Sequence, residues 1–161
     1  MTRLSRGCRL VASALLLCLP VLARAQAATA APTPDTDGVI LIDGATTRDA
    51  FTKGRPLIET GGYKIHASRR DAAGTAEVHA KDTDIFYVQE GSATLVTGGR
   101  PLEAKSTAPD EVRGSGIEGG RTRTVAKGDV IIIPAGVPHW FKAVNAPFLY
   151  YTVKVPGTGA K

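Results

Sequence analysis

The chain has 161 residues, a formal net charge of +5, 18 glycines, 10 prolines and two cysteines. This composition, with short runs rich in Val, Ile and Thr, favours one compact and mostly β domain over a helical bundle or two domains. The charge first points to an anionic partner such as nucleic acid, but its distribution along the chain removes that argument.

Residues 1–27 resemble an export signal. Three arginines precede the apolar run 10–22, and small residues follow in the alanine pairs 23/25 and 25/27. The apolar run is shorter than the roughly 20 residues of a membrane-spanning helix, so we predict cleavage and no stable membrane insertion of the mature chain. The mature protein is then expected in the periplasm or outside the cell.

Cleavage at this point changes the charge and the cysteine content. Residues 1–27 hold four of the 20 Lys and Arg residues and no acid, which leaves 16 basic and 15 acidic residues, a net charge of +1. A nucleic-acid partner is therefore not expected. Cys8 and Cys18 are also lost, so the mature chain has neither a disulfide nor a thiolate ligand or nucleophile.

Residues 28–37 contain Pro32 and Pro34 among small and polar residues and are predicted to form a flexible tether. The folded domain is expected to span residues 38–161. Its first element is predicted to be a strand over Val39 to Ile42.

A single helical turn is predicted next. Thr46 or Thr47 is a candidate N-cap for a turn through Asp49 to Phe51, and Gly54 and Pro56 are expected to end it.

The rest of the chain alternates short β-prone segments with turn signals. The expected strands are 63–68, 76–80, 85–89, 93–97, 123–126, 130–133, 140–144 and 148–155. About eight strands of this length are typical of a sandwich or barrel. The stretch 100–122 breaks the rhythm with prolines, glycines and mixed charge, so it is predicted to be a long loop that could cover a pocket.

Four residues with ligand-type side chains stand out in two clusters. Glu77 and His79 are two apart in a predicted strand and therefore share a face, while Asp84 opens the next strand and would approach His79 by antiparallel pairing. His139 follows a turn and opens a later strand. Phe86 and Phe141 lie two residues beyond Asp84 and His139, respectively, and are expected to form an apolar pocket wall that also belongs to the core.

These clusters resemble the two motifs of the cupin superfamily. The first motif reads Gly, a spacer, His-x-His, four residues, Glu, six residues and Gly, which this chain matches as Gly74, Glu77-Val-His79, Asp84 and Gly91. The second reads Gly, five residues, Pro-x-Gly, two residues and His, matched as Gly128, Pro134-Ala-Gly136 and His139. The resemblance covers about residues 57–155.

The resemblance implies a small all-β domain, the double-stranded β-helix or jelly-roll barrel, with a pocket inside. By position, His79, Asp84 and His139 take the places of metal-binding residues, and Glu77 stands where the first His of the motif belongs. Two imidazoles and up to two carboxylates suit Mn(II), Fe(II) or Zn(II).

Two alternatives remain open at this point. Glu77 can be a metal ligand, an outer partner of a ligand or a general base. Alternatively, the whole set can be a metal-free hydrogen-bonded network in which the two carboxylates satisfy the two histidines.

Other residues have weaker claims to the site. His66 is expected on the strand face opposite the pocket, and Arg69 and Arg70 are expected at a solvated strand end, although they could meet an anionic substrate. Four aromatic residues are candidates for packing between sheets or for a homodimer interface of the kind many cupins form: Tyr87, Trp140, Tyr150 and Tyr151.

Two functions compete. The first is a metal-dependent enzyme of lyase, isomerase or dioxygenase type, with a small-molecule substrate and Glu77 or a bound water to move a proton. The second is a non-catalytic module that binds a small ligand or a metal ion. The fold alone cannot decide between them.

Overall fold

The computed structural model of the chain describes residues 32–157. The predicted signal peptide, residues 1–27, and the first part of the predicted tether lie outside the described residues. Residues 33–39 are exposed, with a turn near Asp37. No helix among residues 32–157 is long and apolar enough to cross a bilayer.

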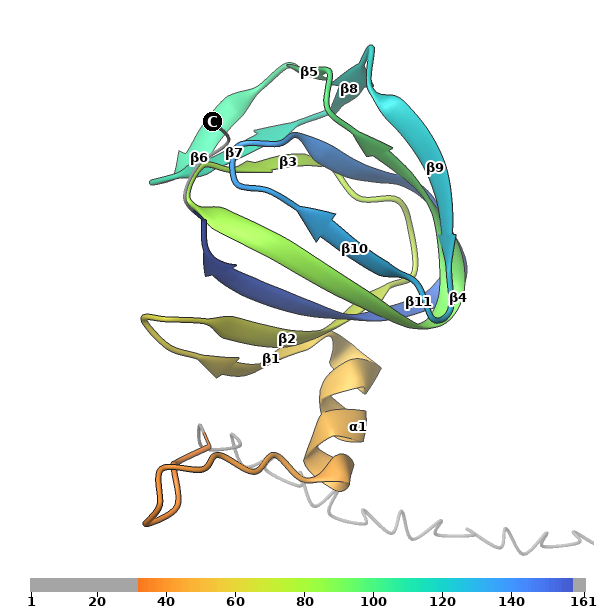
Figure 1. Cartoon of the computed structure of the whole chain (residues 1–161). Helices are drawn as coiled ribbons and strands as arrows, with labels where there is room; N and C mark the ends of the chain where they lie inside the picture. Colours follow the sequence, from red (N-terminus) through yellow and green to blue (C-terminus); the bar gives the residue numbers. More distant parts are fainter. Residues whose placement is uncertain (1–31, 158–161) are drawn as a thin grey trace, which may run out of the picture. The chain divides into compact units, whose positions relative to one another are not determined.

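Two long antiparallel strands, β4 (Asp82–Thr97) and β11 (His139–Pro156), pair along their whole length and form the centre of a barrel. Their first halves and second halves lie in different layers, because both strands bend. One layer contains β1, β2, the second half of β11, the first half of β4 and β10; the other contains β6, β7, β3, the first half of β11, the second half of β4 and β9. Figure 1 shows these strands around a common interior.

The remaining strands are short. Their bounds are β1 Arg55–Glu59, β2 Lys64–Arg70, β3 Ala76–His79, β5 Arg100–Leu102, β6 Lys105–Ala108, β7 Glu111–Gly114, β8 Gly116–Glu118, β9 Arg121–Ala126 and β10 Val130–Ile133. Strands β5 and β8 form a separate two-stranded sheet, drawn at the top of Figure 1. The all-β jelly-roll barrel predicted from the two motifs is confirmed.

The bend of β4 depends on Gly91, the last glycine of the first motif. Gly91 has φ +78°, and a Cβ built on it would lie 2.5 Å from the carbonyl oxygen of Pro147 and 2.9 Å from that of Asn145. The bends of β4 and β11 are therefore in direct backbone contact. Only a residue without a side chain allows both the left-handed conformation and this approach.

We expect Gly91→Ala to destabilise the domain by more than about 2 kcal/mol, because about 1–2 kcal/mol of left-handed strain adds to the backbone overlap. Gly128→Ala is the matched control: Gly128 has φ +93° but no atom within 4 Å of a built Cβ, so it reports the strain alone. Urea unfolding of both variants measures the difference. Equal losses of stability would show that the contact between the two bends contributes nothing.

The one helix of the described residues, α1 (Gly44–Lys53), is longer than the predicted turn and begins earlier. Asp43, rather than Thr46 or Thr47, is its N-cap: Oδ1 of Asp43 accepts from the backbone N–H groups of Ala45 (2.8 Å) and Thr46 (2.9 Å). A carboxylate offers two oxygens and also binds the Thr46 hydroxyl through Oδ2. Gly54, with φ +63°, ends the helix as predicted.

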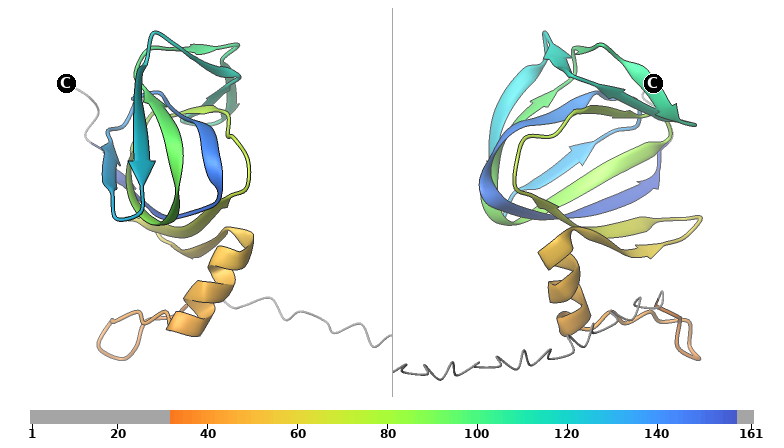
Figure 2. Two further views of the ribbon diagram at one scale, coloured as in Figure 1. Left: turned by 90° about the vertical axis from the view of Figure 1, so that its right-hand side faces the viewer. Right: turned by 180° about the vertical axis from the view of Figure 1, so that it is seen from behind.

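The C-terminal end of helix α1 packs against the outer face of β1 and β2, as Figures 1 and 2 show. A small core cluster lies between the helix and these two strands, and its buried residues are Ala50, Leu57 and Ala67. The rings of Phe51 and Tyr151 are in edge-to-face contact beside it, with their centroids 5.0 Å apart. The main core cluster fills the barrel and includes Phe86, Phe141, Phe148 and Tyr150. The apolar face of β2 thus points out to the helix, and its other face points into the barrel.

Two predictions of secondary structure are wrong. Residues 39–42 form no strand, because a turn closed by Asp37 holds Val39 and leaves it 54% exposed, with no neighbouring strand to pair with. The stretch 100–122 is not a loop: it contains β5, β6, β7 and β8 and the start of β9, and β7 pairs with β3 in register. Gly114 ends β7 and Gly116 begins β8, whereas Pro101 is the central residue of β5.

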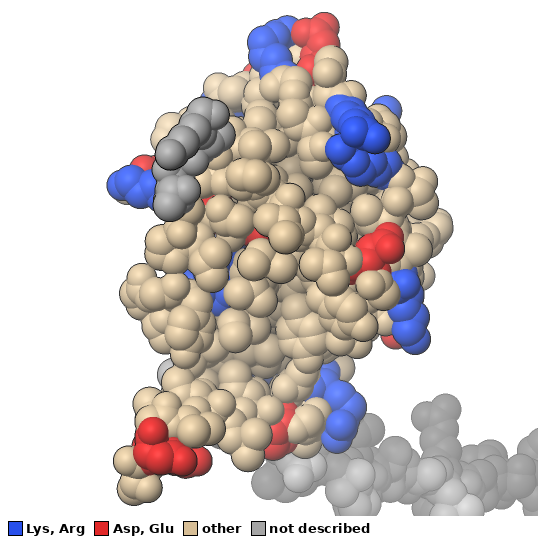
Figure 3. All heavy atoms as spheres, in the orientation of Figure 1, with Lys and Arg blue, Asp and Glu red and all other residues tan. Residues whose placement is uncertain are grey.

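On the face shown in Figure 3, lysine, arginine and acidic residues lie mostly towards the edges, and the centre is largely uncharged. Val130 and Ile132 of the edge strand β10 are 62% and 63% exposed, and Tyr87 of β4 is 43% exposed. Of the four aromatic residues considered for an interface, Tyr150 is buried, Tyr151 packs on α1, and Trp140 is half-buried with Nε1 donating to the carbonyl of Gly74. Tyr87 is the exposed one.

Candidate metal site

The four residues singled out by the sequence come together at one end of the barrel interior. Glu77 and His79 alternate along β3 and point inward, and His139, the first residue of β11, pairs through its backbone with Glu77. Asp84 lies on β4. Although β3 and β4 follow each other in the chain, they form no ladder among the described residues, so Asp84 approaches His79 across the barrel from the opposite layer and not from an adjacent strand.

The distances converge on the Nε2 atoms of the two histidines. Oδ2 of Asp84 lies 3.4 Å from Nε2 of His79 and 3.6 Å from Nε2 of His139. Oε2 of Glu77 lies 3.6 Å and 3.9 Å from the same two atoms. His79, Asp84 and His139 are each less than 5% exposed. Two imidazole nitrogens and two carboxylate oxygens therefore face one small buried space.

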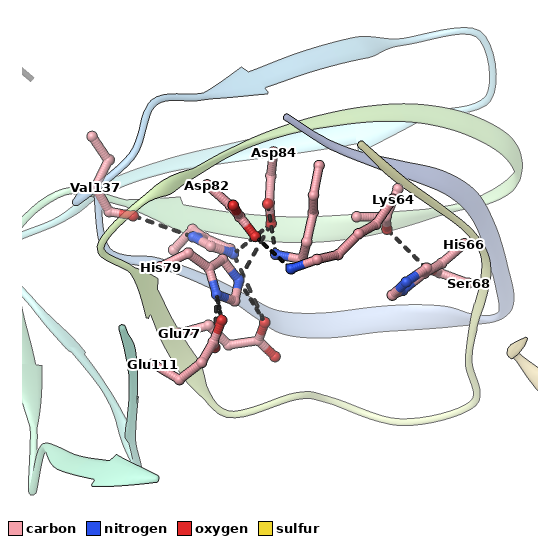
Figure 4. Close-up of polar contacts among 12 residues, drawn as sticks. Lys64, His66, Ser68, Glu77, His79, Asp82, Asp84, Glu111 and Val137 are labelled. Atoms are coloured by element: carbon pink, nitrogen blue, oxygen red, sulfur yellow. Dashed lines mark hydrogen bonds and ion pairs between the residues drawn. The ribbon is translucent and has the colours of Figure 1, made fainter. Parts of the chain in front are cut away.

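An oxygen acceptor contacts Nδ1 of each imidazole, whereas Nε2 faces the carboxylates. Glu111 of β7 faces Nδ1 of His79 with both carboxylate oxygens, at 2.6 Å and 2.7 Å, as Figure 4 shows. The carbonyl of Val137 lies 3.2 Å from Nδ1 of His139. An Nδ1–H that donates to such a partner leaves the Nε2 lone pair free to face the site.

Each carboxylate is held in the same way by a cation on its second oxygen. Lys154 of β11 donates to Oδ1 of Asp84 at 2.7 Å. Oε1 of Glu77 is paired with Arg113 of β7 and, at 3.3 Å, with Nη2 of Arg70 of β2. Oδ2 and Oε2, the oxygens that face the histidines, remain available.

The donor set fits a divalent metal ion. Nε2 of His79 and Nε2 of His139 are buried and have no hydrogen-bond partner among the described residues. Leaving a buried polar nitrogen unpaired costs about 1–3 kcal/mol, so two such atoms beside the same carboxylate oxygens suit a site that binds a cation. Ligand atoms of Glu77, His79 and His139 all lie within 4.8 Å of one another. Neutral imidazoles with carboxylates suit Mn(II), Fe(II) or Zn(II).

The site opens into a cavity of about 220 Å³ inside the barrel. Phe86 and Phe141 line one wall and belong at the same time to the main core cluster, as expected. Three cationic side chains also line the cavity: Arg70, Arg113 and Lys154. They lie beside Glu77, His79, Asp84 and His139, which we call the ligand set. This space is smaller than the roughly 300–1,000 Å³ of most ligand pockets, so it admits only a small molecule.

A family model described as "Cupin" matches residues 43–160. The chain belongs to the cupin family. The match covers every strand of the barrel, from β1 to β11, in agreement with the two motifs.

Solved structures resemble this cupin in fold. BH2720 from Bacillus halodurans has 16% sequence identity and a TM-score of 0.53, over 80% of this chain and 89% of that one. KdgF from a Halomonas species has 17% identity and a TM-score of 0.43, over 63% and 77% of the two chains. The polyketide cyclase RemF from Streptomyces resistomycificus has 25% identity and a TM-score of 0.43, over 66% of each chain. No curated protein gives a significant match.

Two predictions about strand β2, which pairs with β11, are wrong. His66 lines the cavity and does not lie on the opposite face, although Nε2 pairs with Glu59 at 2.7 Å and not with the ligand set. Arg70 is not at a solvated strand end: it points into the barrel, while Arg69 is paired with Asp71 outside. The apolar residues of β2 pack on α1, which reverses the face that we expected to point inward.

Sequence reasoning missed the residues that support the ligand set. Glu111 and Arg113 alternate on β7, inside the stretch interpreted as a loop. Lys154 alternates with Tyr150 and Thr152 on β11, a polar face opposite an apolar one. This alternation was the available signal, because a strand with one polar face can point that face into a cavity.

The charges of the metal-free site follow from these contacts. Burial alone would raise the pKa of Glu77, but His79, Arg113, His139 and Arg70 outweigh it and lower the pKa to about 2. Burial opposes a charged His79, but Asp84 and Glu77 outweigh it and raise its pKa to about 9. Burial lowers the pKa of His139. At neutral pH, without a metal, His79 is therefore an imidazolium, His139 a neutral imidazole and Glu77 a carboxylate.

We expect metal binding at pH 7.5 to release about one proton, because His79 must lose its proton to become a ligand. Titration calorimetry with Zn(II) in buffers of different ionisation enthalpy, such as HEPES and Tris, measures this number. Binding heats that are the same in all buffers, after correction for dilution, would contradict the protonated state of His79.

The same pKa values predict how the stability of the metal-free protein depends on pH. The raised pKa of His79 stabilises the folded state fully below pH 6.5, and this contribution is lost as the pH rises through about 9. The lowered pKa of Glu77 stabilises it above about pH 4.5 and is lost as the pH falls towards 2.

Proposed function

We propose that this cupin is a divalent-metal-dependent enzyme that acts on a small organic molecule by lyase, isomerase or dioxygenase chemistry. The observation that carries the proposal is the pair of buried, unpaired Nε2 atoms that face two fixed carboxylate oxygens at the end of a small cavity. A divalent ion bound there would act as a Lewis acid towards an oxygen atom of the ligand.

The residues of the site have different roles in the proposed function. His79, His139 and Glu77 hold the ion, and Asp84 lies beside them as the fourth donor. Oε1 of Glu77 is paired with Arg113 and Arg70, and Oε2 faces Nε2 of both histidines, so Glu77 suits the role of ligand better than that of general base. Phe86 and Phe141 form a wall that excludes water from one side of the ligand.

The alternative is a non-catalytic module that binds a small ligand. One observation favours it: Glu77, Asp84 and Glu111 are already paired with cationic or imidazole partners in the metal-free site. Such a paired network can persist without a metal and still present a polar cavity.

One experiment separates the two functions. The protein, loaded with Mn(II), Fe(II) or Zn(II), is screened against small organic molecules by thermal shift, and each hit is incubated for long periods and followed by NMR. We expect product that disappears after chelation and returns when the metal is restored, and no product with His139→Ala. Hits recovered unchanged from fully metal-loaded protein would instead support the binding module.

The pattern of residues 1–27 also leads us to propose that the enzyme acts in the periplasm or outside the cell. The observed family membership does not bear on this point.

A further inference from the structure

Arg70 differs from the other two cations in the cavity. Lys154 and Arg113 are paired with carboxylates, Lys154 at 2.7 Å from Asp84 and Arg113 with both Glu77 and Glu111. Arg70 reaches Glu77 through Nη2 alone, at 3.3 Å, longer than the roughly 2.7–2.9 Å of a strong charged hydrogen bond. Its guanidinium is thus the least neutralised positive group that lines the cavity.

Neutral neighbours fix the orientation of Arg70. Its Nε donates to the hydroxyl of Tyr150 at 2.9 Å, and its guanidinium carbon lies 5.3 Å from the centre of the Phe141 ring. Tyr150 and Phe141 are both buried core residues, so the fork is positioned before any ligand binds.

The guanidinium also has an edge left for a ligand. Among residues 32–157, Nη1 of Arg70 has no hydrogen-bond partner. A side chain on residue 74 would overlap Nη1, Cζ and Nη2 of Arg70, so Gly74, the first glycine of the first motif, allows the guanidinium to take this position. The side chain of Arg70 is 24% exposed and lines the same cavity as His79 and His139.

The balance of charge points in the same direction. Three cations, Arg70, Arg113 and Lys154, face three acids, Glu77, Asp84 and Glu111, around the ligand set. With neutral histidines these charges cancel, so a divalent ion adds two positive charges to a largely buried site. A bound anion offsets that excess, whereas a neutral sugar does not.

We propose that the ligand of the cavity is a small carboxylate, and that Arg70 binds its carboxylate group through the free edge of the guanidinium. This inference rests on the proposed function, because the excess charge arises from the bound metal. A planar guanidinium fork matches the two oxygens of a carboxylate. The volume of about 220 Å³ limits the ligand to a small organic acid.

Calorimetry on the metal-loaded full chain tests this assignment with three acids and their uncharged amides as probes: lactate and lactamide, malonate and malonamide, succinate and succinamide. We expect at least one acid to bind, and its amide to bind at least about tenfold more weakly. Equal affinity for the acid and its amide would overturn the proposal, and so would tighter binding of inorganic phosphate than of any carboxylate.

Variants then test the role of Arg70. We expect Arg70→Met to weaken binding of the acid at least about tenfold. Arg70→Lys keeps the charge beside Glu77 but lacks the fork, and it is expected to keep the metal and still lose most of the affinity. Arg69→Met is the matched control, because Arg69 is paired with Asp71 outside the barrel and should change neither binding nor metal content.

The metal content of each sample distinguishes a failure of the proposed substrate class from a failure of the proposed metal-dependent function. If the wild-type protein holds metal and turns over a substrate but Arg70→Lys binds acids as the wild type does, the substrate class alone is wrong. If the wild-type protein binds no metal, the proposed function itself fails.

Discussion

His79→Ala and His139→Ala should each lower the affinity for Zn(II) or Mn(II) by more than about 100-fold. Loss of an outer partner of a ligand already costs 10–100-fold, and these substitutions remove the ligand itself. Both Nε2 atoms are buried beside the same two carboxylate oxygens, so no other described side chain replaces them. Competition with a chelating dye measures the affinity.

His66→Ala is the control for these variants, because His66 lines the same cavity but pairs with Glu59 and not with the ligand set. It should bind metal as the wild type does. Metal should also raise the thermal midpoint of the wild-type protein and of His66→Ala, since about 2.7 kcal/mol of stabilisation is expected at 100 times the dissociation constant. Unchanged metal affinity in His139→Ala would show that His139 is not a ligand.

Glu111→Ala should weaken metal binding about 10–100-fold, although Glu111 is not expected to touch the ion. Both of its carboxylate oxygens face Nδ1 of His79, and this contact fixes the imidazole with Nε2 towards the site. Glu111→Gln keeps one oxygen acceptor and should recover part of the loss. Metal affinity as a function of pH is the measurement, because removal of the carboxylate changes the proton competition at His79.

The matched control is Glu118→Gln on β8, whose carboxylate pairs with Arg100 at the surface. It should leave metal affinity unchanged at every pH. If Glu111→Ala and Glu118→Gln behave alike, the contact between Glu111 and His79 does not position the imidazole.

The four candidate ligands could be singled out from the sequence because they lie in short motifs. Spacing along strands puts Glu77 and His79 on one face, and the turn before His139 brings the second cluster to the same end of the barrel. The prediction that Asp84 approaches His79 is confirmed, but its reason is wrong. Strands β3 and β4 follow each other in the chain, but β3 and the first half of β4 lie in different layers and therefore do not pair.

The charged residues that contact the candidate ligands could not be predicted from short motifs. Arg70, Glu111 and Lys154 come from three strands far apart in the chain, and only the closed barrel brings them together. The inward face of β2 is its polar face, because its apolar face packs against the C-terminal end of α1 and against β1. A pattern of alternation tells which residues share a face, but which face points inward depends on what packs on the other side.

X-ray diffraction at the absorption edge of the metal shows whether His79, His139 and Glu77 hold an ion. Crystals of the metal-loaded protein should give one strong anomalous peak per chain, within about 2.0–2.3 Å of Nε2 of His79, Nε2 of His139 and Oε2 of Glu77. A metal-loaded sample with no peak there, and with a hydrogen bond from Nε2 of His79 to Asp84 or Glu77 in its place, would contradict the account.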